Sequence, residues 1–139
     1  MTAISNSMIS GGSMTAHVDL EIKAGADYQH DFTVYESEDD SDPRDLTGDV
    51  IEGEFRLEDA NGRVLFAVSP DDGISISDAV NGVFRMTIDR DKTESLRFRY
   101  PEIYGTFDLE LTPPSGFPRK RIVQGELTIT RDNTRGNNS

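Results

Sequence analysis

The sequence predicts an all-β domain, an antiparallel β-sandwich of about seven to eight strands with one short helical turn. Apolar and polar residues alternate over several short runs, which is the period of a strand with one buried face. Glycine, proline and asparagine separate these runs at intervals of roughly ten residues. The length of 139 residues is enough for one domain with a single core.

The clearest signal is a pair of strands near the end of the chain, at 104–111 and 119–130. Phe107, Leu109 and Leu111 alternate with polar residues in the first of them, and Leu127 and Ile129 share one parity in the second. The connection between them contains prolines and a glycine, which cannot continue a ladder. A closing hairpin is therefore expected, with Phe107 and Leu109 facing the core.

Six further strands are expected in the rest of the chain, at 17–22, 28–34, 50–57, 63–68, 74–77 and 83–89. Asn-Gly occurs at 61–62 and at 81–82, and this pair favours the two-residue type I′ hairpin turn because both of its residues tolerate positive φ. Asp91, with Glu94 three positions later, predicts a capped helical turn. The set is typical of an immunoglobulin-like sandwich.

The domain is expected to span 14–131, between a flexible N-terminal arm at 1–13 and a polar tail at 132–139. The arm has no periodicity and ends in Gly-Gly-Ser, as flexible segments do. Ile4, Met8 and Ile9 have no partner strand in this scheme. We expect the arm either to stay disordered or to order on a neighbouring subunit at an exposed sheet edge, so these three residues are candidate partner-binding residues.

The charge is unevenly distributed along the chain. The formal net charge is −12, and residues 31–60 hold twelve carboxylates against Arg44 and Arg56. Such a surface repels phosphate, which argues against nucleic acid as a partner. It is either a solvated surface that opposes aggregation or a rim that meets a basic neighbour. On the second interpretation Asp39, Asp40 and Asp42 are candidate partner-binding residues.

Few residues in the chain suggest catalysis or metal binding. The absence of cysteine excludes disulfides and thiolate chemistry. Of the two histidines, His17 and His30, the second shares its strand face with aromatic residues, so we expect a structural histidine and no enzymatic activity. The acidic loop 36–49 offers oxygen ligands for calcium, but its spacing does not match an EF-hand. We expect no metal, cofactor or membrane partner.

Several segments, read in order, are similar to a family of small tailed-phage proteins. They are Lys-Ala-Gly-Ala-Asp-Tyr at 23–28, Asp-Leu-Thr-Gly at 45–48, Asn-Gly-Val-Phe-Arg-Met-Thr-Ile at 81–88, Tyr-Gly-Thr-Phe-Asp-Leu-Glu-Leu at 104–111 and Gly-Glu-Leu-Thr-Ile-Thr at 125–130. Over about residues 14–134 the chain resembles the N-terminal domain of siphophage upper baseplate proteins and related stand-alone virion proteins of β-sandwich fold.

The resemblance implies a structural component of the virion, made in the bacterial cytoplasm and placed at the baseplate, tail, neck or capsid surface. It implies an adaptor or decoration module that contacts other virion proteins in several copies and has no catalytic residues. Two alternatives stay open. A carbohydrate-binding module for host attachment would need exposed aromatics on one sheet face, yet Tyr28 and Tyr35 differ in parity and there is no tryptophan. An inhibitor that mimics nucleic acid would use the acidic surface.

Overall fold

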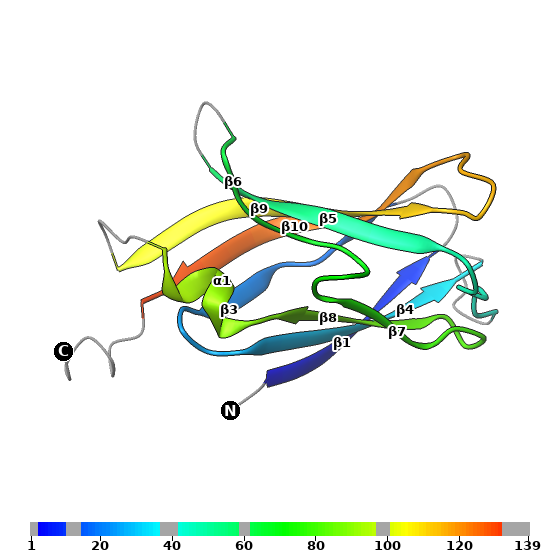
Figure 1. Ribbon diagram of the computed structural model, residues 1–139, viewed down its shortest axis with the longest axis horizontal. Coiled ribbons are helices and arrows are strands. Elements are labelled where there is room, and N and C mark those ends of the chain that lie inside the picture. Colours follow the sequence, from blue (N-terminus) through cyan, green and yellow to red (C-terminus); the bar gives the residue numbers. More distant parts are fainter. Residues whose placement is uncertain (1–2, 11–14, 37–41, 59–61, 97–100, 132–139) are drawn as a thin grey trace.

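Ten strands and one short helix form a two-layer sandwich in the computed structural model, which describes residues 3–10, 15–36, 42–58, 62–96 and 101–131 (Figure 1). One sheet has the strand order β1-β4-β8-β7, and the other has β2-β10-β9-β5-β6 with β3 also paired to β10. The elements are β1 (Ala3–Ser10), β2 (Ala16–His17), β3 (Leu20–Lys23), β4 (Tyr28–Tyr35), β5 (Val50–Leu57), β6 (Val64–Val68), β7 (Ile74–Asp78), β8 (Val83–Ile88), α1 (Arg90–Glu94), β9 (Glu102–Thr112) and β10 (Lys120–Thr130).

The order in which the chain visits the two sheets is immunoglobulin-like. After β4 the chain crosses to the second sheet for β5 and β6, returns for β7 and β8, and crosses again for β9 and β10. This alternation between two facing sheets is the layout of immunoglobulin-type sandwiches. The sandwich and the short helix expected from the sequence are confirmed.

The core lies between the sheets and is built from cross-strand aromatic pairs. Phe32 stands opposite Phe84, with ring centroids 4.9 Å apart, and Phe55 stands opposite Phe107, with centroids 5.3 Å apart. Directly opposed side chains on one face are the units that stabilise a sheet. Leu109, 0% exposed, follows on the same face of β9, so the predicted inward faces of the closing hairpin are confirmed.

The first strand overturns the expectation of a flexible arm at 1–13. β1 pairs with β4 of its own chain in parallel register, from Ala3 opposite Tyr28 to Ser10 opposite Tyr35. The ladder is made by backbone groups, so it needs no apolar periodicity, and without it the outer edge of β4 would present unpaired donors and acceptors. The domain therefore begins near residue 3, and residues 3–10 belong to it.

The helix α1 is also capped differently from the sequence prediction, which placed an acidic cap at Asp91. The N-cap is Asp89, whose side chain makes no capping hydrogen bond. Instead, the amide of Arg90 donates to Oδ1 of Asp27 at 2.8 Å, and Asp27 lies in the turn between β3 and β4. Oγ1 of the buried Thr93 accepts from the amide of Gly25 at 3.0 Å. The helix is thus fixed to a distant turn at the end of the sandwich opposite the β9–β10 connection (Figure 1).

Candidate functional site

Three connections meet at one end of the sandwich, which we call the loop end. They are β4–β5 (36–49), β7–β8 (79–82) and β9–β10 (113–119), on the right in Figure 1. The amide of Leu46 donates to the carbonyl of Ala79 at 2.8 Å, which joins the first two connections. A Cβ built on Gly48 would lie only 2.8 Å from Cγ of Pro114, so the first and third are also in close contact. The loop end is therefore one surface made by three distant parts of the sequence.

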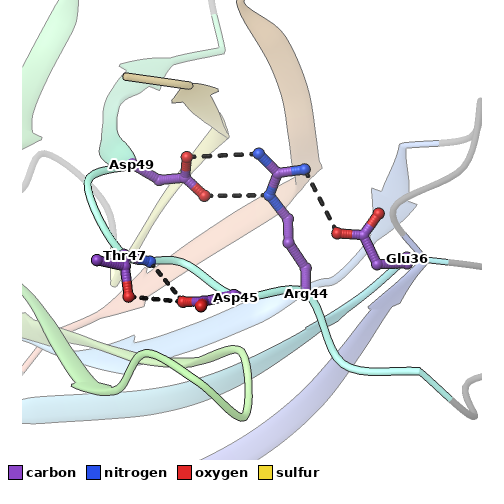
Figure 2. Close-up of polar contacts among 5 residues, drawn as sticks. All are labelled: Glu36, Arg44, Asp45, Thr47 and Asp49. Atoms are coloured by element: carbon purple, nitrogen blue, oxygen red, sulfur yellow. Dashed lines mark hydrogen bonds and ion pairs between the residues drawn. The ribbon is translucent and has the colours of Figure 1, made fainter. Parts of the chain in front are cut away.

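Arg44 holds the β4–β5 connection together (Figure 2). Its Nε donates to Oδ2 of Asp49 at 3.0 Å and its Nη2 to Oδ1 at 3.4 Å, while Nη1 lies 3.7 Å from Oε1 of Glu36. The side chain of Asp49 is only 2% exposed, and that of Arg44 is 27% exposed. The hydrogen bond to Asp49 raises the pKa of Arg44. A two-pronged contact of this kind fixes both the distance and the orientation of the groups, so it ties the two ends of the connection.

A second set of bonds shapes the turn between Arg44 and Asp49. Oδ1 of Asp45 accepts from the amide of Thr47 at 2.9 Å and from its Oγ1 at 2.6 Å, and these bonds lower the pKa of Asp45. A side chain that closes a turn onto the amide two residues later imitates a backbone turn. Leu46, 0% exposed, anchors the segment in the core. The described part of the connection is thus preorganised.

Large apolar side chains are exposed at this end. The exposed fraction is 80% for Phe117, 68% for Val80 and 41% for Val50. The turn that carries Phe117 is fixed by two hydrogen bonds, from the amide of Gly116 to the carbonyl of Pro113 and from Oγ of Ser115 to the carbonyl of Phe117, both 2.8 Å. The backbone of this turn is ordered while the phenyl ring of Phe117 lies in water, so Phe117 is a candidate contact residue for a partner.

The loop end exposes charges of both signs. Asp42, Asp45 and Asp78 are exposed, and none of them forms an ion pair with a residue that the structure describes. Arg44 is occupied by Asp49 and Glu36. Arg119 in the β9–β10 connection, with a side chain 57% exposed, and the exposed Lys120 at the start of β10 add two positive charges.

The predicted partner-binding residues fall into two groups. Asp42 lies at the loop end, where its carbonyl accepts from the amide of Glu36 at 2.7 Å, whereas Asp39 and Asp40 lie outside the described residues. Ile4, Met8 and Ile9 lie on β1, in register with Gln29, Thr33 and Val34 of β4. The partner contacts of all six stay predictions.

Sequence reasoning did not single out Phe117 or Arg44. Phe117 had a weak signal, because it is an aromatic residue in a proline-rich connection with no core face to occupy. Arg44 had no such signal, because the sequence does not show which of the many acidic residues in its loop is buried and pairs with it.

The other sites considered from the sequence are placed as follows. His30 is 5% exposed, its Nδ1 lies 3.1 Å from the hydroxyl of Tyr28, and burial lowers its pKa while the nearby Asp31 acts in the opposite direction. Tyr28 is 9% exposed and packs in the core, so it offers no platform for a sugar. Across the described ranges, no three acidic or histidine side chains are grouped as metal ligands. No helix in these ranges is long and apolar enough to cross a membrane.

Comparison with known protein families finds no match, and comparison with curated proteins finds none either. Among solved structures, the chain is similar to murine CRIg at 10% identity and TM-score 0.39, covering 82% of this chain and 92% of that one. It is similar to the cysteine protease inhibitor EhICP2 from Entamoeba histolytica at 8% identity and TM-score 0.32, covering 93% of this chain and 97% of that one. It is also similar to the CooA pilin subunit from enterotoxigenic Escherichia coli at 11% identity and TM-score 0.39, covering 86% of this chain and 92% of that one. These likenesses add no argument about what the chain does.

Proposed function

We propose that this chain is a non-enzymatic structural protein of a tailed-phage virion, which joins or decorates other virion proteins through its loop end. The observation that carries the proposal is the bonding of three connections into one surface that exposes Phe117, Val80 and Val50. Loops held on a rigid sandwich are common sites of recognition. A surface that is already ordered also loses little entropy when it binds.

The virion part of the proposal draws on the resemblance to phage proteins. The segments that carry it include 81–88 and 104–111, which form β8 and most of β9. These strands lead into and out of the loop end, so the resemblance covers the scaffold that positions the surface. Baseplate, tail, neck and capsid surface are all compatible locations. The partners are other virion proteins, in several copies, without nucleic acid or membrane.

Mass spectrometry of purified particles tests this function. Particles of a phage that encodes the chain should contain its peptides at an abundance comparable with known structural proteins, and the signal should survive density-gradient purification. A replication protein of the same phage serves as the control for carry-over. If the chain is depleted from particles in parallel with that control, the proposed function is wrong.

A further inference from the structure

We infer that a cleft beside Phe117 binds an extended segment of another virion protein, which places an apolar side chain in the cleft and an adjacent aspartate or glutamate against Lys120. This inference rests on the proposed function and specifies the contact that it requires. Three features of the described residues carry it: the apolar lining of the cleft, its small volume and the uncompensated charge of Lys120 at its border.

The cleft opens between the two sheets at the loop end. Val34 of β4 lines it from one sheet, and Leu111 of β9 and Ile122 of β10 line it from the other. All three aliphatic side chains are buried, so they form its base. Phe117, 80% exposed, and Pro118 border the opening. The cleft therefore combines an apolar base with an aromatic wall that lies in water, as sites that receive a partner's side chain do.

The volume of the cleft suits a protein side chain better than a small molecule. It is about 170 Å³, whereas pockets for cofactors and drug-sized ligands measure roughly 300 to 1,000 Å³. An apolar side chain in the cleft would cover its aliphatic base and contact the ring of Phe117, and the apolar surface of both partners would leave water. Side chains that fill such pockets contribute a large share of the binding energy of protein interfaces.

Lys120 gives the cleft its charge. Side chains alternate along a strand, so Arg119 and Arg121 point to the face of the sheet away from the core. There they lie 3.7 Å from Glu110 and 3.6 Å from Asp108, respectively. Lys120 has the other parity and lines the cleft. It is exposed and forms no ion pair with a residue that the structure describes.

Arg44, the second cation of the cleft, already has its counter-charges. It pairs with the buried Asp49 and lies 3.7 Å from Glu36 (Figure 2). The described residues that line the cleft include no carboxylate, so the charge of Lys120 remains uncompensated at an apolar opening. A partner with an acidic residue next to an apolar one would complement both features, and the charges would guide association. A two-fold contact between copies of this chain, centred on the cleft, would bring two Lys120 side chains together instead.

Site-specific photo-crosslinking in assembled particles identifies the bound segment. A benzophenone amino acid replaces Phe117 in one variant and Tyr104 in the control, and Tyr104 is 54% exposed near the opposite end of β9. Position 117 should yield an adduct with another virion protein, at a peptide in which an apolar residue adjoins aspartate or glutamate, and position 104 should not yield this adduct. In particles that contain the chain, an adduct with a second copy, an adduct at a peptide without an acidic residue or no adduct would overturn the inference.

Competition for incorporation tests the lining and the charge of the cleft. Each variant is produced together with wild type, and the ratio of the two in purified particles is measured by mass spectrometry. We expect Phe117→Ala to be depleted about tenfold or more and Lys120→Glu about fivefold or more. The control Lys23→Glu makes the same change of charge at an exposed lysine of β3, and it should incorporate like wild type. All three variants should melt at temperatures close to that of wild type, since the three positions are exposed.

A charge exchange tests whether Lys120 itself contacts the acidic residue. When the acidic residue of the crosslinked peptide is replaced by lysine, Lys120→Glu should be incorporated better than wild type. If this preference does not appear, or if Phe117→Ala and Lys120→Glu incorporate like wild type, the inference about the cleft is wrong and the proposed function stands. Absence of wild type from particles would refute the proposed function, and the inference with it.

Discussion

Removing the guanidinium of Arg44 should destabilise the protein more than removing any exposed arginine. In Arg44→Met the Asp49 carboxylate, 2% exposed, loses both hydrogen bonds and its counter-charge. Breaking a buried ion pair on one side costs roughly 3 to 5 kcal/mol. Because 27% of the Arg44 side chain is exposed and water can approach, we expect about 2 to 4 kcal/mol, a large part of the stability of one domain.

The double variant Arg44→Met with Asp49→Leu distinguishes a buried unpaired charge from a general loss of packing. It removes both charges and keeps similar volumes, so its stability should lie within about 1 kcal/mol of wild type and well above that of the single variant. The matched control is Arg56→Met. Arg56 pairs with Glu54, but the side chains are 43% and 47% exposed, so its loss should cost no more than about 1 kcal/mol.

Urea unfolding gives the required free energies. The chain has no tryptophan, so unfolding is followed by far-ultraviolet circular dichroism, and an unchanged slope with denaturant confirms that only stability has changed. The reasoning fails if Arg44→Met unfolds within about 0.5 kcal/mol of wild type, a change typical of ordinary surface substitutions. It also fails if the double variant is as unstable as the single one.

Three further predictions concern the core, the first strand and pH. Leu109→Ala, at a 0% exposed position, should lower the unfolding free energy by about 2 to 5 kcal/mol; a loss below about 1 kcal/mol in urea melts would contradict the assigned face. Deleting residues 1–13 should lower the melting temperature and promote self-association, because it exposes the edge of β4 that β1 covers. Calorimetry measures the melting temperature and size-exclusion chromatography measures self-association. If both are unchanged by the deletion, β1 contributes nothing to stability or to covering this edge. Burial lowers the pKa of His30, so below about pH 6.5 His30 takes up a proton more readily in the unfolded chain than in the folded one, and the stability of the protein falls as pH decreases. Between pH 7 and pH 5 the melting temperature of His30→Gln should therefore fall less than that of the wild type. Equal falls in melting temperature for the two proteins would refute this prediction.

The strands of the sandwich could be predicted because their signals are local. Phe84, Met86 and Ile88 alternate with polar residues and are all 0% exposed in β8. The connection before them is longer than the two-residue turn that Asn81-Gly82 favours: it spans 79–82, the amide of Gly82 donates to the carbonyl of Ala79 at 3.0 Å, and Gly82 has a φ of +75°, a conformation that favours glycine. In these segments neighbouring residues determine which face of the strand is buried and where the chain turns, and the tertiary structure agrees with this local pattern.

The features that escaped prediction depend on parts of the chain far apart in sequence. Strict alternation in β10 does not include Ile122, yet the register shifts between Arg121 and Val123 and both Ile122 and Val123 are buried, as a β-bulge allows. The bond from Arg90 to Asp27 joins residues 63 positions apart. Neither the bulge in β10 nor the hydrogen bond from Arg90 to Asp27 can be predicted from the residues next to it in sequence. The same is true of the ladder that β1 makes with β4.

The candidate site shows the same division between local and distant causes. The excess of acids at 31–60 is visible in the sequence, but which acids remain available depends on Arg44. It compensates the buried Asp49 and approaches Glu36 at 3.7 Å, so it cannot also neutralise Asp42 or Asp45, which keep their charge at the surface. One arginine therefore stabilises the base of the loop end and leaves the carboxylates of Asp42 and Asp45 without an ion-pair partner among the described residues. The positive charge at this end comes instead from Arg119 and Lys120 of the β9–β10 hairpin, so the loop end offers a partner charges of both signs.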